Sequence, residues 1–152
     1  MGKRWAQAAF TGEGARIAGG RWNSKGTSIV YLASSLALAA LELLAHVDHQ
    51  RALAEHVAIP VDFDESLVEK LHDESLPIDF PEVGTLWATQ QIGDAWARGQ
   101  SSVMLRVPSA VVPVEFNYLY SPGHPQAEGV VIGSPIPFRF DRRLLDDESR
   151  QS

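Results

Sequence analysis

The sequence GGRWNSKGTSIVYLASSLALAALELLAH, residues 19–46, decides how the rest of the chain is interpreted. It begins with a loop in which two glycines, an arginine, a tryptophan and an asparagine follow one another. The β-branched and aromatic residues from Ile29 to Ala33 predict a strand, and Ser34 or Ser35 can cap the helix that follows. Side chains that do chemistry concentrate in loops held between rigid elements. The stretch therefore predicts a small pocket for a ligand with a phosphate at one end and a ring or ribose at the other.

The helix is predicted over residues 36–50, and it is apolar on most sides, which is typical of a central, buried helix. Glu42 is its one acid and lies one turn before His46, on the same face. Because an isolated buried charge is very costly, Glu42 must be paired, hydrogen-bonded or protonated. Two interpretations stay open. One is a structural salt bridge to Arg16 or Arg21, and the other is a carboxylate held for chemistry.

The bulk composition is that of one globular domain. The chain has 152 residues, 45% of them hydrophobic and 21% charged, enough to bury a sizeable core. It has no cysteine, which excludes disulfides, thiolate metal sites and cysteine nucleophiles. A net charge of −6 argues against non-specific binding of nucleic acid. No apolar leader and no run of roughly 18–20 apolar residues is found, so a soluble, cytoplasmic protein is expected.

The remaining pattern predicts an α+β fold with about five or six strands and two or three helices. Residues 3–17 are rich in glycine and are predicted to be mostly loop. Strands are predicted at 57–63, with Pro60 at an edge or bulge, and at 102–107, 114–120, 130–132 and 136–140. A short helix is predicted at 66–73 and a longer one at 85–98 with Gly99 as its stop, whereas 76–83 is expected to be irregular and 141–152 a charged, fraying tail.

Three further side chains have both a structural and a functional interpretation. The planar fork of Arg21 suits bidentate recognition of phosphate, and a surface ion pair is the alternative. Tyr31 is by default a core aromatic, and Ser109, next to a proline, is by default a turn hydroxyl. Trp22, Trp87 and Trp96 are expected in the core. The common cofactor and hydrolase motifs are missing, and the five histidines predict no metal site.

Three segments of the chain resemble the RES-domain toxins. They are GEGARIAGGRWNSKGTSIVYLASSLALAALELLAH (Gly12–His46), SSVMLRVPSAVVPVEFNYLYSPGHP (Ser101–Pro125) and PFRFDRRL (Pro137–Leu144). The family is named for an arginine, a glutamate and a serine, which match Arg21 in GGRWN, Glu42 in ALELLAH and Ser109 in VPSAVVP. Tyr31 matches the tyrosine that accompanies them. The resemblance covers nearly the whole chain in the same order.

The resemblance implies a single RES domain over residues 1–152, with a split antiparallel sheet and flanking helices around an NAD cleft, as in the ADP-ribosyltransferases. It implies a bacterial toxin that arrests growth by cleaving the nicotinamide–ribose bond of NAD, its co-substrate. The enzyme would be a protein ADP-ribosyltransferase, or an NAD glycohydrolase or phosphorylase. The implied partner is an Xre-like antitoxin, with an oligomer of the two as one form. A protein such as phosphoribosyl pyrophosphate synthetase is the implied acceptor, and no direct contact with nucleic acid or membrane is implied.

The resemblance also assigns roles to residues. Glu42 would stabilise an oxocarbenium-like state, directly or through the ribose hydroxyls. Arg21 would grip the pyrophosphate, Tyr31 would stack on or abut the nicotinamide, and Ser109 would hydrogen-bond the nicotinamide ribose or amide. Asn23 would orient the loop. The implied catalytic residues are Glu42, Arg21, Tyr31 and Ser109, and the implied NAD-binding residues are Arg21, Trp22, Asn23, Tyr31 and Ser109.

Two positions depart from the family pattern. Members usually begin with a strand of the type tryptophan–arginine–(isoleucine or valine), of which only Lys3-Arg4-Trp5 could remain here, and Ser121 stands where asparagine is more usual. A second hypothesis is therefore an attenuated or inactive module that binds NAD or an antitoxin. A third is an unrelated α+β fold with a structural pair of Glu42 and an arginine. The intact set of arginine, tyrosine, glutamate and serine favours the enzyme.

Overall fold

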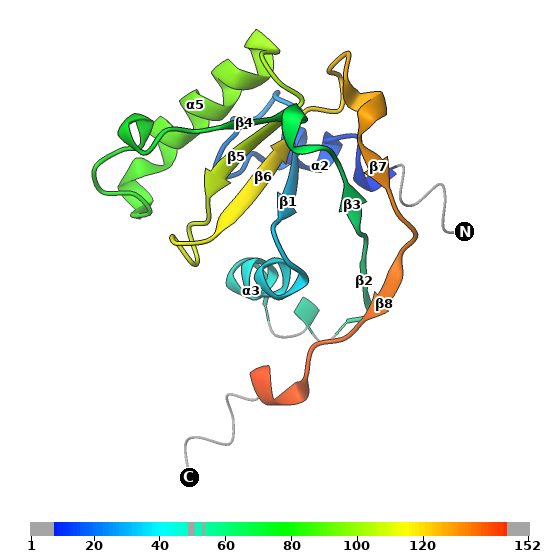
Figure 1. Cartoon of the computed structure of the whole chain (residues 1–152). Coiled ribbons are helices and arrows are strands. Elements are labelled where there is room, and N and C mark those ends of the chain that lie inside the picture. Colours follow the sequence, from blue (N-terminus) through cyan, green and yellow to red (C-terminus); the bar gives the residue numbers. More distant parts are fainter. Residues whose placement is uncertain (1–7, 49–50, 53, 146–152) are drawn as a thin grey trace.

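The computed structural model describes residues 8–48, 51–52 and 54–145. A four-stranded sheet of order β1-β6-β5-β4 lies at its centre (Figure 1). Its strands are β1 (Val30–Ala33), β6 (Phe116–Tyr120), β5 (Met104–Pro108) and β4 (Val68–Lys70). The first three are antiparallel, and β4 runs parallel to β5. The predicted α+β class is confirmed. The parallel pair departs from a wholly antiparallel sheet, and the likeness to ADP-ribosyltransferases stays a prediction.

Two small sheets lie beside β1 in Figure 1. In one, β2 (His56–Ala58) pairs with β8 (Ile136–Phe138), and in the other β3 (Val61–Asp62) pairs with β7 (Val131–Ile132). The strand predicted at 57–63 is therefore divided at Pro60, which has no N–H with which to continue a ladder. The carbonyl of Pro60 instead accepts a hydrogen bond of 2.7 Å from the Gly133 N–H.

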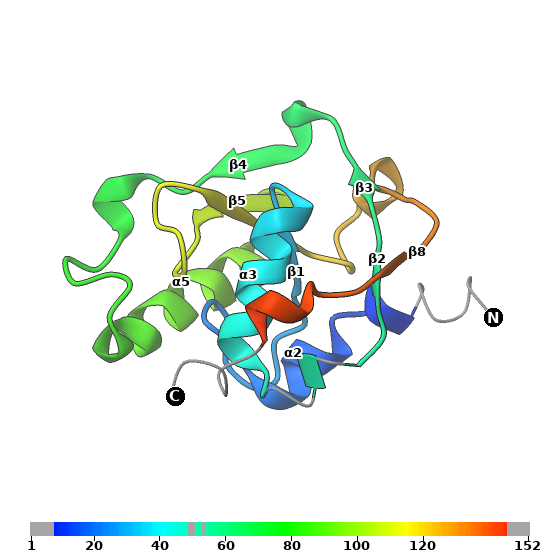
Figure 2. The same ribbon diagram turned by 90° about the horizontal axis from the view of Figure 1, so that it is seen from below.

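Three helices have bounds within the described residues: α2 (Glu13–Ala18), α3 (Leu36–His46) and α5 (Leu86–Gly99). The predicted cap of α3 is confirmed, because the Ser35 hydroxyl accepts the Leu38 N–H at 3.1 Å. The prediction of a central, buried helix is wrong. Only Leu38 is buried in α3, while Leu36 and Leu41 are 52% and 44% exposed. The helix lies across one end of β1 (Figures 1 and 2). Its side away from the sheet is covered only in part, where Ala40, Leu43 and Leu44 pack against Phe140 and Leu145.

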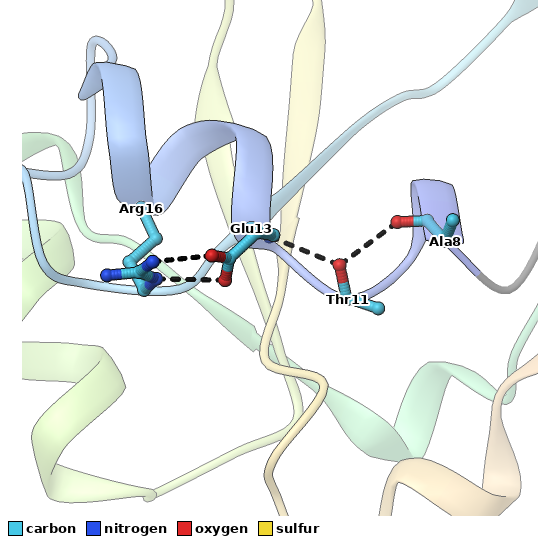
Figure 3. Close-up of polar contacts among 4 residues, drawn as sticks. All are labelled: Ala8, Thr11, Glu13 and Arg16. Atoms are coloured by element: carbon cyan, nitrogen blue, oxygen red, sulfur yellow. Dashed lines mark hydrogen bonds and ion pairs between the residues drawn. The ribbon is translucent and has the colours of Figure 1, made fainter.

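The segment 3–17 was predicted as loop, but its last residues form α2. Figure 3 shows how that helix begins: the Thr11 hydroxyl donates to the Ala8 carbonyl at 3.0 Å and accepts the Glu13 N–H at 3.3 Å. Gly12, at a φ of 74°, provides the left-handed residue before the first turn. Residues 1–7 lie outside the described part of the chain.

The prediction of a helix at 66–73 is also wrong. Residues 65–67 form a 3₁₀ turn and β4 follows, paired to β5 and continued by a 3.0 Å bond from the Leu71 N–H to the Arg106 carbonyl. This edge pairing overrides the local helical pattern. With β4 and the divided strand, the described residues contain eight strands rather than five or six. The helix predicted at 85–98 is confirmed as α5, although Gln100, at a φ of 51°, takes the left-handed capping position expected of Gly99.

The core has a cluster on each face of the central sheet. On one face, residues of β5 and β6 pack against α5 and the loop before β1; the buried members are Trp22, Ile29, Trp96, Leu105, Val107 and Leu119. On the other face, Phe10, Val30, Val103, Met104, Tyr120 and Val130 pack together, with residues of β3 and β7 against them.

The tryptophan predictions divide accordingly. Trp22 and Trp96 are core residues, but Trp87 is 72% exposed. It precedes the buried Thr89 by two residues, which is about 200° around a helix, so it lies on the outer side of α5. None of the described helices is long and apolar enough to span a membrane.

Candidate active site

Glu42 is held by two neutral donors from the central sheet. Its Oε1 accepts a hydrogen bond of 2.6 Å from Ser109 Oγ and one of 2.7 Å from Asn117 Nδ2. Helix α3 places the glutamate over the ends of β5 and β6, where the other two residues lie. We call Glu42, Ser109 and Asn117 the Glu42 cluster.

Of the two interpretations left open for Glu42, the structural salt bridge with Arg16 or Arg21 is wrong. Arg16 pairs with Glu13 within α2 (Figure 3). Across residues 8–48, 51–52 and 54–145, no ion pair involves Glu42 or Arg21. The carboxylate of Glu42 is therefore held in place without a neighbouring positive charge, and its other oxygen has no hydrogen bond from a described residue.

Ser109 is fully buried at the end of β5, where the chain turns towards β6. Its hydroxyl accepts the N–H groups of Val111 and Val112 at 3.1 and 3.0 Å and donates to Glu42. The turn-hydroxyl interpretation is confirmed. Since a hydroxyl has one proton and two acceptor sites, all of its capacity is in use. In this arrangement Ser109 positions the glutamate.

Sequence reasoning missed Asn117. The residue lies on β6, opposite Ala33 of β1 and Val107 of β5. Its sequence context carried a signal, because in FNYLY the alternation of a strand puts Asn117 and Leu119 on the same face. Leu119 is fully buried in the core against α5. An amide in register with such a residue needs partners, and Glu42 is one.

A second set of contacts joins Tyr31 to the loop before β1. The Tyr31 hydroxyl donates to Asn23 Oδ1 at 2.6 Å and accepts the Trp22 N–H at 3.0 Å. Asn23 is fully buried, and its amide nitrogen donates to the carbonyls of Ala15 and Thr27 at 2.8 and 3.1 Å. Asn23 thus orients the loop. The indole of Trp22 belongs to the core, with its ring centroid 5.8 Å from that of Phe80, so Trp22 reaches Tyr31 through its backbone only.

Gly20 permits this approach. A Cβ at that position would lie 2.7 Å from the Tyr31 hydroxyl and 3.0 Å from Asn23 Oδ1, so the Tyr31 side chain would have to shift. Of the paired glycines at 19 and 20, the second therefore leaves room for the Tyr31 hydroxyl, whereas Gly19 has a positive φ of 72°.

Helix α5 holds the same loop from the other side. Thr89 Oγ1 donates to the Arg21 carbonyl, Gln90 Nε2 donates to the Gly20 carbonyl at 3.0 Å, and the Ser24 N–H donates to Asp94 Oδ1 at 2.9 Å. Burial works against ionisation of Asp94, but hydrogen bonds from Ser24 and Thr27 and the charge of Arg98 together outweigh it and hold its pKa below the usual value.

The Arg21 side chain is only loosely engaged. Its Nη1 is 3.5 Å from Thr85 Oγ1, and its guanidinium carbon is 6.0 Å from the centroid of the Phe80 ring. Both are weak contacts. The guanidinium is half-buried, has no carboxylate partner in the part of the chain that the structure describes, and can bind an anion.

The two sets of residues share one face of the central sheet. Tyr31 and Ala33 point the same way because side chains alternate along β1. Ala33 lies opposite Asn117, and Tyr31 lies opposite Leu119. The structure therefore places the Tyr31 contacts at one end of β1 and the Glu42 cluster at the other, on the same side.

One cavity of the structure does not coincide with the Glu42 cluster. A cavity of about 690 Å³ lies between β1 and the strands β2, β3 and β8. Tyr31 lines it, but Arg21, Glu42 and Ser109 do not, and most of its wall is apolar. The hydrogen bonds around Glu42 and Tyr31, rather than this cavity, define the candidate site.

The RES domain family matches residues 1–141. The chain belongs to the RES domain family. The resemblance described from the sequence is thereby confirmed.

Three relatives of this RES domain have similar lengths. A protein named Toxin Res from Yersinia enterocolitica is 36% identical over 143 residues, which cover 93% of this chain and 94% of that one. Another Toxin Res, from Photorhabdus laumondii, is 35% identical over 119 residues, covering 78% and 76%. A protein named Prs ADP-ribosylating toxin, from a Sphingobium species, is 33% identical over 139 residues, covering 90% and 86%.

The Tyr31 hydroxyl gives a testable signature of the loop contacts in this RES domain. Burial raises the pKa of Tyr31 to about 12, which the hydrogen bond from the Trp22 N–H only partly opposes and the Asp94 carboxylate reinforces. A raised pKa means that the folded state favours the protonated hydroxyl. Its contribution to stability is complete below the ordinary tyrosine pKa of about 10 and is lost as pH rises towards 12.

We expect Tyr31→Phe to lose stability less steeply than the wild type between those two pH values. Urea unfolding at stepped pH measures the slope, and ultraviolet titration of tyrosinate follows the ionisation itself. Burial also raises the pKa of Tyr120, so some alkaline loss should persist in both proteins. Equal slopes for wild type and variant would contradict the assignment to Tyr31.

Proposed function

We propose that this RES domain is a toxin enzyme that cleaves the nicotinamide–ribose bond of NAD. The observation that carries the proposal is the geometry of the Glu42 carboxylate. Ser109 and Asn117 donate to one of its oxygens, and the other oxygen accepts no hydrogen bond from a described residue. Leaving of nicotinamide builds positive charge on the ribose, and a fixed carboxylate stabilises such an oxocarbenium-like state. No described cation lies within ion-pair distance of Glu42, so the carboxylate is open to a positively charged ligand group.

Arg21 and Tyr31 supply the binding half of the proposal. The guanidinium of Arg21 would hold the pyrophosphate through paired hydrogen bonds. Tyr31 would lie against the nicotinamide, with its hydroxyl fixed by Asn23 and Trp22. Asn23 and the Trp22 backbone would act indirectly, by keeping the loop that carries Arg21 in place. Ser109 would act through Glu42, because its hydroxyl is fully engaged.

We further propose that the ADP-ribose is transferred to a protein. The name of the Sphingobium relative, Prs ADP-ribosylating toxin, supports this reaction. Phosphoribosyl pyrophosphate synthetase is the acceptor that the family resemblance implies, and hydrolysis or phosphorolysis of NAD are the competing outcomes. An Xre-like antitoxin would be the partner that keeps the enzyme inactive in the cytoplasm.

Proton NMR of the purified chain with NAD tests the proposal. We expect free nicotinamide to appear, and we would compare buffer alone, added phosphate and added phosphoribosyl pyrophosphate synthetase. ADP-ribose as the product would indicate hydrolysis, and a phosphorylated ADP-ribose would indicate phosphorolysis. An increase in the mass of the synthetase would indicate transfer of ADP-ribose to the protein. Binding of NAD without nicotinamide release in any sample would refute the enzyme and favour the inactive binding module.

A further inference from the structure

The side-chain oxygen of Asn117 is a buried acceptor for which the structure provides no donor. Among the described residues, Asn117 Oδ1 is the buried side-chain nitrogen or oxygen atom that has no hydrogen-bond partner. The same amide makes a bond of 2.7 Å through Nδ2 to Glu42. Native proteins satisfy nearly all buried polar atoms, so an orphaned one requires an explanation.

Reversing the amide does not remove the problem. It would place Oδ1 against the Glu42 carboxylate, and two acceptors cannot bond to each other without a proton. The donation to Glu42 therefore fixes which way the amide faces. Holding the glutamate and leaving Oδ1 without a donor are two results of one orientation.

The orphaned oxygen must lie beside the carboxylate that we propose acts on NAD, because Oδ1 and Nδ2 are bonded to the same carbon. Asn117 also shares its sheet face with Tyr31. A ligand group that satisfies Oδ1 must be a hydrogen-bond donor. The phosphates of NAD offer none at neutral pH, whereas its nicotinamide riboside half carries ribose hydroxyls and a carboxamide N–H.

We propose that Asn117 is a substrate-binding residue with two functions: Nδ2 positions Glu42, and Oδ1 accepts a hydrogen bond from the nicotinamide riboside half of NAD. This inference rests on the proposed function. A ribose hydroxyl is the donor we favour, because Glu42 acts at the ribose and Oδ1 lies next to Glu42. The carboxamide N–H is the other source of the same chemistry.

Two variants of similar shape separate these functions from a structural one. Asn117→Leu removes donor and acceptor together, and we expect kcat/KM for NAD to fall by about 10- to 100-fold. Asn117→Asp keeps a carbonyl acceptor and, when protonated, a donor to Glu42. Repulsion between two adjacent carboxylates raises the pKa of the introduced carboxyl, so this variant should be most active at acidic pH and lose activity as pH rises.

The wild type provides the reference for that pH profile. The other titratable side chains on the elements around Asn117 are His46, whose Nδ1 lies 2.7 Å from the Glu42 carbonyl, together with Tyr31, Arg106, Glu115, Tyr118 and Tyr120. All of them are present in both variants, so a profile that appears only in Asn117→Asp belongs to the new carboxyl. Tyr118→Phe, at the next residue of β6 and on its opposite face, is the matched control and should turn over NAD as the wild type does.

An analogue of NAD identifies the donor. In 3-acetylpyridine adenine dinucleotide a methyl ketone replaces the carboxamide, so the ribose hydroxyls remain and the N–H is absent. An Asn117→Leu penalty of the same size on both substrates assigns the bond to a ribose hydroxyl. A penalty that vanishes on the analogue assigns it to the carboxamide.

The outcomes also separate this inference from the proposed function. Asn117→Leu that remains folded and cleaves NAD at the wild-type rate would overturn the inference and leave the function standing. If Asn117→Leu fails to fold, an Asn117→Asp variant with a wild-type pH profile would overturn it. A wild type that neither binds NAD in calorimetry nor cleaves it would overturn both.

Discussion

Replacing Glu42 by glutamine is expected to lower the rate of nicotinamide release by about 10²- to 10⁴-fold. The glutamine oxygen can take the place of Oε1 and accept the hydrogen bonds from Ser109 and Asn117. The local structure should therefore survive, and the change removes the negative charge alone. Initial rates measured by proton NMR, beside thermal unfolding of both proteins, test this expectation.

Glu128→Gln is the matched control for that experiment. It makes the same chemical change at an exposed position after β6, far along the chain from the Glu42 cluster. Its rate and melting temperature should equal those of the wild type. If Glu42→Gln released nicotinamide as fast as Glu128→Gln, Glu42 would not be the catalytic carboxylate.

Gly93→Ala is expected to destabilise the fold by about 3 kcal/mol and to remove most of the activity. A Cβ on Gly93 would overlap the carbonyl oxygen of Trp22, so helix α5 and the loop could not both stay in place. The neighbouring contacts of α5 with Arg21 and Ser24 would be lost together with the close approach. Urea unfolding followed by circular dichroism measures the change in the free energy of unfolding.

Gly99→Ala is the control on the same helix. No atom lies within 4 Å of a Cβ built there, and alanine is a better helix former than glycine. We expect Gly99→Ala to be as stable as the wild type or more stable by about 0.5–1 kcal/mol. If Gly93→Ala unfolded at the same midpoint urea concentration as the wild type, α5 would be able to move without cost, contrary to the packing described.

The sequence predicted well where the deciding interactions are local. The strand at 30–33, the Ser35 cap and helix α5 follow from side-chain pattern and from groups a few residues apart. The prediction for 66–73 failed because pairing with β5, a strand more than thirty residues later, decided its conformation. The prediction that α3 is buried failed for a related reason, because composition alone does not show whether an apolar helix is covered by a second layer.

The candidate site divides in the same way. Arg21, Tyr31, Glu42 and Ser109 were chosen by resemblance. The structure brings Glu42 and Ser109 into contact and puts Tyr31 on the sheet face of Asn117, while Arg21 lies on the loop before β1. Their partners depend on distant residues: Ser109 and Asn117 are 67 and 75 positions from Glu42. A pattern of single residues could not select neutral donors over Arg16 or Arg21 as the partners of Glu42. Asn117 was missed because an amide in a strand has no motif of its own.

Strand β1 also determines how far apart the two halves of the site are. Tyr31 is separated by two residues from Ala33, the neighbour of Asn117, and a strand rises about 3.3 Å per residue, so the offset along β1 is about 7 Å. An extended backbone can neither stretch nor shorten, so this offset depends only on the count of residues. Deleting or inserting one residue within β1 would turn Tyr31 to the opposite face of the sheet from Asn117. Deleting or inserting a single residue among these four positions should therefore abolish the enzymatic activity even where the strand still pairs. Most substitutions that keep the strand at four residues should not.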